Sequence, residues 1–144
     1  MGFKDDLKFG NIYEKKLINL IPNDNYKIME GNFPFYDIEI IKDDINTKYE
    51  VKADRYTYKT NNIVIEYECR AKPSGINISQ SNYYAYYVVN PNNKDDLYII
   101  PTNDIKEYIK NRNYKRIISG GDNGVSKMYI FDKNIFSKYI VYDN

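Results

Sequence analysis

The sequence predicts an α/β fold in a single domain, and three observations support this prediction. Its 144 residues suit one domain and are too few for two of typical size. Apolar residues at helical spacing occur near the N-terminus and again at residues 103–111. Elsewhere, short runs rich in Ile, Val and Tyr are separated by Gly, Pro and Asn, as in strands joined by turns. We therefore expect one domain over residues 1–144, with a mixed central sheet flanked by helices.

Three helices are expected. Residues 6–21 carry apolar side chains at helical spacing, and Pro22 ends this pattern. Residues 78–85 are expected to form a short helix. Thr102 is a suitable cap for a third helix over residues 103–111, whose isoleucines would face inward.

Strands are expected where short apolar runs lie between turn-forming residues. Asp43, Asp44 and Asn46 supply a hairpin turn between two of these runs, and a polar loop covers residues 54–62. The expected strands are residues 26–29, 35–41, 48–53, 63–69, 86–89, 97–100, 114–118 and 127–131.

The composition limits the chemistry that this chain can perform. It has no histidine, which excludes Ser-His-Asp and Cys-His catalytic units, His-ligated zinc sites and His-based ribonucleases. Its one cysteine, Cys69, excludes an internal disulfide and any metal site made of several cysteines. Hydrolysis would therefore depend on carboxylates, lysine, tyrosine and a metal ion.

The charge balance and the apolar runs bear on partners and location. With 21 basic and 20 acidic side chains, only a local patch could hold nucleic acid. The 17 tyrosines are weak evidence for RNA binding, because Asn, Ile, Lys and Tyr all have AT-rich codons. No apolar run approaches the roughly 18 residues needed to cross a bilayer. We expect a cytoplasmic or nuclear protein without a membrane partner.

Charged residues are expected to gather where two predicted strands meet. Side-chain alternation places Glu50, Lys52 and Asp54 on one face of the strand at residues 48–53. Asp37 lies in the preceding strand, and the hairpin would set the two strands side by side. These charges would then converge on one edge of the sheet.

These residue types suit the hydrolysis of phosphodiester bonds. Mg²⁺ prefers oxygen ligands and takes one or two carboxylates, which leaves positions for water and phosphate. Asp37 and Glu50 would bind Mg²⁺ or Mn²⁺, with the carbonyl of Val51 as a further ligand, and Lys52 would handle the attacking water and the developing charge. The alternative is a solvated edge strand, which is common in a chain with 28% charged residues.

The motifs around these residues resemble those of the PD-(D/E)XK nuclease superfamily. Residues 36–39, Tyr-Asp-Ile-Glu, are similar to the motif with the first metal ligand, and residues 49–52, Tyr-Glu-Val-Lys, to the motif with the second ligand and the catalytic lysine. Residues 50–76 resemble a subgroup of small nucleases from phages and large DNA viruses. The resemblance covers about residues 10–89. It departs from the family at Tyr36, where the family name has Pro, and at Asn61, where the subgroup has Gly.

The resemblance implies a fold and an activity. The fold would be the restriction-endonuclease-like core, αβββαβ, with the helices at residues 6–21 and 78–85 on opposite faces. The activity would be metal-dependent cleavage of DNA, which is favoured over RNA, by an endonuclease in repair, recombination or replication. Glu14 matches the acidic position of the first helix, and Gln80 with Tyr84 matches a QxxxY element, so Glu14 and Gln80 are further catalytic candidates.

Phosphate contacts are expected from polar residues near the site, and alternatives to a nuclease stay open. The candidates for phosphate contact are Arg55, Lys59, Arg70, Lys72 and Ser74. Symmetric cleavage of two strands would need a homodimer. A catalytically inactive DNA-binding or assembly module with the same fold is the main alternative, and a protein-interaction domain is the third.

Overall fold

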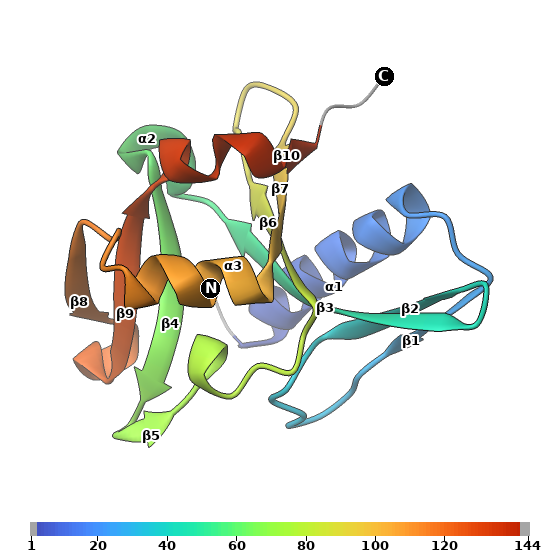
Figure 1. Cartoon of the computed structure of the whole chain (residues 1–144), viewed down its shortest axis with the longest axis horizontal. Coiled ribbons are helices and arrows are strands. Elements are labelled where there is room, and N and C mark those ends of the chain that lie inside the picture. Colours follow the sequence, from blue (N-terminus) through green and yellow to red (C-terminus); the bar gives the residue numbers. More distant parts are fainter. Residues whose placement is uncertain (1–2, 142–144) are drawn as a thin grey trace.

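In the computed structural model, which describes residues 3–141, the chain forms two β-sheets with helices packed against them (Figure 1). Sheet A is mixed, because β3 and β6 are parallel and its other neighbouring strands are antiparallel. The prediction of an α/β fold with a mixed sheet flanked by helices is therefore confirmed. In spatial order, sheet A contains β1 (Asn25–Ile28), β2 (Ile38–Lys42), β3 (Ile45–Asp54), β6 (Tyr83–Val88), β7 (Asp96–Pro101) and β10 (Ile140–Val141).

Sheet B is antiparallel and has four strands. The expected αβββαβ core would place residues 63–69 in the central sheet, but these residues belong to β4 of sheet B. In spatial order, sheet B contains β5 (Lys72–Pro73), β4 (Asn62–Cys69), β9 (Ser126–Asp132) and β8 (Arg116–Gly120).

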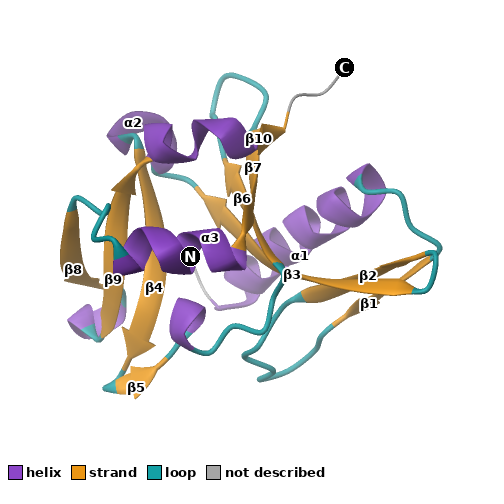
Figure 2. Ribbon diagram, viewed as in Figure 1, coloured by secondary structure: helices purple, strands orange, loops and turns teal. Residues whose placement is uncertain are grey.

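Helix α1 (Phe3–Leu20) packs on one face of sheet A (Figure 2). Tyr13, Leu17 and Ile18 are its buried positions, and the spacing of 4 and 1 places them on one side of the helix. The sheet residues that they meet are Ile38, Ile40, Tyr49, Ala85, Tyr87 and Leu97. The amphipathic pattern of residues 6–21 thus identified a helix that covers the sheet.

The opposite face of sheet A forms the second core. Alternation along β6 turns Tyr84, Tyr86 and Val88 to this side, where all three are almost fully buried. They pack with Ile63, Ile65 and Phe131 of sheet B, Ile105 of α3 (Thr102–Lys110) and Phe136 of the 3-10 helix η3 (Lys133–Tyr139).

The helix predicted over residues 78–85 is wrong. The chain instead makes one short 3-10 turn, η1 (Gly75–Asn77), and enters strand β6 at Tyr83. Strand β6 is covered on both faces, so its residues are apolar without alternation, and such a run cannot be told from a buried helix by periodicity.

Two smaller elements complete the described part of the fold. A single helical turn, α2 (Thr57–Thr60), lies inside the segment expected to be a loop, and η2 (Asp122–Gly124) connects β8 to β9. No helix within residues 3–141 is both long and apolar enough to cross a membrane.

Candidate functional site

The candidate site lies where β3 changes its hydrogen-bonding partner. Strand β2 pairs with β3 from Ile45 to Tyr49, whereas β6 pairs with β3 from Tyr49 to Asp54. Among the described residues, no strand pairs with β3 beyond Tyr49 on the side of β2. The second half of β3 therefore has one unpaired edge, and the predicted metal ligands lie beside it.

Asp37 lies at this edge and is held by both main chain and side chain. Its N–H donates to the carbonyl of Tyr49 at 2.9 Å, and its carbonyl accepts from Met29 at 2.9 Å. Its Oδ2 accepts the N–H of Val51 at 2.7 Å. The Asp37 carboxylate thus takes the place of a strand partner for Val51.

Glu50 and Lys52 point to the same face of β3, as alternation predicts. The Lys52 Nζ lies 3.5 Å from Glu50 Oε1, and the two side chains are 47% and 13% exposed. Glu50 is directly beside Tyr84 in the parallel register between β3 and β6. The lysine can therefore reach solvent while the glutamate is largely enclosed.

Glu14 approaches the same place from α1, between the buried residues Tyr13 and Leu17. Its Oε2 is buried and has no hydrogen-bond partner. Burial, together with the nearby Asp37 and Glu50 carboxyls, raises the pKa of Glu14 from 4.5 to about 7. A buried carboxyl oxygen without a partner is costly unless a proton or a cation meets it.

The pKa values of Glu50, Asp37 and Lys52 are also shifted by burial and by the charges around them. Burial raises the pKa of Glu50 to about 7, with Lys52 opposing this shift and Asp37 adding to it. Burial also raises the pKa of Asp37, against the lowering effect of the Val51 N–H. Partial burial disfavours the ammonium of Lys52, but Glu50, Asp37 and Glu66 outweigh it, so the pKa of Lys52 is raised. Lys52 is therefore a positively charged hydrogen-bond donor at neutral pH.

The donor set fits a hard divalent cation, although it is not already arranged as a three-residue ligand cluster. Among the described residues, no group of three or more acidic, cysteine or histidine side chains converges closely enough to form one. Mg²⁺ needs only one or two carboxylates and takes its other ligands from water and phosphate. The unpartnered oxygen of Glu14 and the crowded carboxyls of Asp37 and Glu50 both favour an added positive charge.

Asp54 has a structural role, although alternation places it on the face of Glu50 and Lys52. Its Oδ1 accepts the N–H groups of Tyr56 and Thr57 at 2.7 and 3.1 Å, and its Oδ2 accepts the hydroxyl of buried Tyr86. Asp54 thus fixes the start of α2.

Gln80 lies between the 3-10 turn η1 and strand β6. Its side chain is exposed, and its main-chain N–H donates to the carbonyl of Phe35 at 2.9 Å. Tyr84, the second residue of the same motif, is instead 2% exposed and lies beside Glu50. Sequence spacing puts forward Gln80 rather than Tyr84 as the catalytic candidate, and the difference in burial between them is seen only in the structure.

Ser74 binds a neighbouring glutamate. Its hydroxyl donates to Glu66 Oε2 at 3.0 Å. The next residue, Gly75, has a φ of +50°, and a Cβ there would lie 2.1 Å from the carbonyl oxygen of Glu66. The Ser-Gly pair therefore locks the turn after β5 against β4.

The four basic candidates for phosphate contact lie in two places. Arg70 and Lys72 are exposed at the turn between β4 and β5, and the predicted helix at 78–85 that would have joined them in a phosphate site is absent. The guanidinium of Arg55 lies 3.7 Å from the ring centre of Phe9, and Lys59 is exposed on α2. Of these four residues, Arg55 is the one that lines the same groove as Lys52.

A groove of about 860 Å³ begins at the site and runs between the end of β3 and one face of sheet B. Lys52 and Glu66 belong to its lining, so the groove and the charged cluster are continuous. The rest of its lining is Phe9, Ala53, Asp54, Arg55, Tyr56, Val64, Tyr86, Ile118, Gly120, Gly121 and Met128. This groove could not be predicted from the sequence, because its walls come from segments far apart in the chain.

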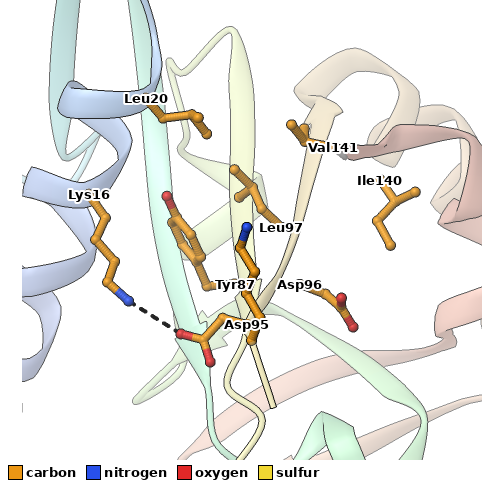
Figure 3. A pocket seen from close by; sticks show the side chains of 9 residues that line it. Lys16, Leu20, Tyr87, Asp95, Asp96, Leu97, Ile140 and Val141 are labelled. Carbon is orange, nitrogen blue, oxygen red and sulfur yellow. Dashed lines mark hydrogen bonds and ion pairs between the residues drawn. The ribbon is translucent and has the colours of Figure 1, made fainter. Parts of the chain in front are cut away.

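A second hollow lies elsewhere, between the end of α1 and strands β7 and β10. Figure 3 shows Lys16 pointing toward Asp95, with 3.5 Å between Nζ and Oδ2, and the apolar side chains of Leu97 and Val141 nearby. Neither Lys52 nor any of the crowded carboxylates lines this hollow, whereas Lys52 lines the groove beside β3. We therefore place the functional site at the split edge of β3.

No protein-family model, curated protein or solved structure matches this chain.

Proposed function

We propose that this chain is a nuclease of the PD-(D/E)XK type that hydrolyses DNA phosphodiester bonds with Mg²⁺ or Mn²⁺. The observation that carries the proposal is the crowding of Glu14, Asp37 and Glu50 beside Lys52. Full ionisation of the three carboxyls against one ammonium would leave excess negative charge in a partly buried place, which is why their pKa values are raised. Such an arrangement costs free energy unless a cation balances it.

The fold around these residues supports the same assignment. Helix α1 brings Glu14 onto the β2–β3 hairpin, and this hairpin carries Asp37, Glu50 and Lys52. We propose that α1, this hairpin and parallel strand β6 correspond to the restriction-endonuclease-like core. Strand β4 departs from that core by pairing in sheet B.

Each residue has a separate role in the proposed reaction. Asp37 and Glu50 would hold the cation, with the carbonyl of Val51 as a further ligand, and Glu14 would add a contact through water. A bound divalent ion supplies an activated water and shields the charge on the phosphate. Lys52 stays protonated because its pKa is raised, so it orients that water and donates to the phosphate oxygen on which charge builds.

Cleavage of a substrate panel tests this proposal. The panel contains labelled single-stranded, duplex, flapped and four-way-junction DNA, together with RNA, each in Mg²⁺ and in Mn²⁺. Lys52→Ala should reduce the cleavage rate by about 100-fold or more, because it removes a donor to the developing charge.

Lys48→Ala is the matched control, because Lys48 lies on the same face of β3 but in the half that pairs with β2. It should change the rate by no more than about twofold. Calorimetric titration with Mn²⁺ should give a binding site that Asp37→Asn and Glu50→Gln abolish. If the folded wild type cuts none of the substrates and binds no metal, the inactive DNA-binding or assembly module becomes the better account.

A further inference from the structure

We propose that the groove beside Lys52 binds an unpaired DNA strand, so that the chain acts on single-stranded DNA or single-stranded flaps in preference to continuous duplex. This inference rests on the proposed nuclease function, because it names the substrate that the groove would bring to Lys52. Lys52 lines the groove and also belongs to the charged cluster, through its ion pair with Glu50. A strand lying in the groove would therefore pass its phosphates beside Lys52, whose ammonium pairs with Glu50.

The groove presents flat and apolar surfaces of the kind that stack on bases. Tyr56 is 65% exposed, although its main chain is fixed by the bond from its N–H to Asp54. The Arg55 guanidinium lies over the ring of Phe9, and these two planar groups form a second surface on which a base could stack. Aromatic rings and guanidinium planes are the groups on which proteins stack unpaired bases.

The opposite wall is apolar and adaptable. Ile118 and Met128 are paired residues of β8 and β9, and both line the groove on the same face of sheet B as Val64. Gly120 leaves space there for the flexible Met128 side chain, whose Cε would lie 2.4 Å from a Cβ at that position. This wall can fit bases of different size without reading their edges.

The charge of the groove argues against a continuous duplex as its occupant. Duplex binding depends on many contacts between basic side chains and phosphates, whereas bases within a duplex are stacked on one another. Among the described residues that line the groove, Lys52 and Arg55 are the basic ones, against the acidic Asp54 and Glu66. An exposed ring such as Tyr56 gains a stacking partner only where bases are unpaired.

Binding measurements by fluorescence anisotropy test the inference. Labelled oligo(dT) and a blunt duplex of the same length are compared in Ca²⁺, for the wild type, Tyr56→Ala and Tyr26→Ala. The wild type should bind oligo(dT) more tightly than the duplex. Tyr56→Ala should weaken oligo(dT) binding about tenfold, equivalent to ~1.4 kcal/mol, through loss of one stacked base.

Tyr26→Ala is the control, because Tyr26 is 48% exposed on β1, the far edge strand of sheet A. It should bind as the wild type does. The dependence of affinity on salt should be equal for Tyr56→Ala and the wild type, since a stacking contact releases no counterions. Duplex binding at least as tight as oligo(dT) binding, or no effect of Tyr56→Ala, would overturn the inference.

Cleavage of the same two substrates in Mg²⁺ separates this inference from the proposed function. If the chain cuts duplex DNA and Tyr56→Ala cuts it equally well, the groove assignment fails while the nuclease assignment stands. If oligo(dT) binds through Tyr56 but no DNA is cut, the nuclease assignment fails while the groove assignment stands.

Discussion

The two halves of β3 have the same alternation of side chains but very different surroundings. In the first half, β2 runs alongside, and polar side chains have partners, such as Asn46, whose Nδ2 donates to Glu39 Oε1 at 2.7 Å. In the second half, β2 has ended and Glu50 meets Asp37 and Lys52. The contrast shows that the end of the neighbouring strand, rather than the pattern within β3, creates the charged cluster.

The physical basis of this contrast is the unpaired edge of the sheet. A strand that has lost its neighbour presents main-chain groups that need other partners. The Asp37 carboxylate meets one of them by accepting the N–H of Val51. The same opening admits Glu14 from α1, whose buried oxygen has no partner. The second half of β3 thus has a charged opening at the edge of the sheet, where we propose that the cation binds.

The largest expected loss of stability is at Asp54, in the second half of β3. Asp54→Ala removes the acceptor for two main-chain N–H groups and for the buried Tyr86 hydroxyl. We expect a loss of about 2 to 3 kcal/mol in the free energy of unfolding, measured with urea. Asn46→Ala in the first half removes one partly buried bond and should cost about 1 kcal/mol or less. Equal losses would contradict the structural role given to Asp54.

A smaller change is expected at Glu14, where substitution by Gln should increase the stability of the folded state rather than reduce it. Its pKa is raised from 4.5 to about 7, so the folded state favours the protonated form. The unfolded state releases this proton first, and stability therefore falls as the pH rises from about 4.5 through 7. Glu14→Gln has no such charge, so without divalent ions it should be more stable than the wild type at pH 8 by about 1 kcal/mol or more.

Urea unfolding at pH 4 and pH 8 checks this prediction. The higher stability of Glu14→Gln should be absent at pH 4, where Glu14 is mostly protonated in the folded and in the unfolded state. The exposed Glu30, changed to Gln, is the matched control and should give no gain at either pH. Addition of Mn²⁺ should stabilise the wild type more than Glu14→Gln. A variant that is less stable than the wild type at pH 8 would show that Glu14 is not under charge repulsion.

The smallest expected effect concerns Gln80. Its side chain is exposed, and its main-chain bond to Phe35 survives substitution by alanine. Gln80→Ala should change the initial cleavage rate of the best substrate in the panel by no more than about twofold. A loss above tenfold would mean that Gln80 reaches the site when substrate binds, and would restore its role as a catalytic residue.

Much of the architecture near the site was accessible from the sequence, because it depends on local patterns. Residues 6–21 predicted α1, and the turn at Asp43 and Asp44, both of which adopt positive φ, predicted the β2–β3 hairpin. Alternation placed Glu50 and Lys52 on one face. Each of these features is encoded within a few consecutive residues.

The features that sequence reasoning missed depend on contacts between distant segments. Residues 83–88 form a strand because α1 covers one face of β6 and sheet B the other, and nothing within the segment distinguishes this from a buried helix. The groove is invisible in the sequence for the same reason, since Phe9, Tyr56 and Ile118 meet only after folding.

By itself, the sequence determined the α/β class, helix α1, the β2–β3 hairpin and the carboxylates and lysine on it, because helical and strand periodicity are local properties of the chain. Only the tertiary structure decided that β4 joins a second sheet, that Asp54 caps a turn, and that Glu14 lies half-buried near Asp37 and Glu50. The physical reason is that burial, and with it the pKa of each carboxyl, is set by whichever segments pack around it.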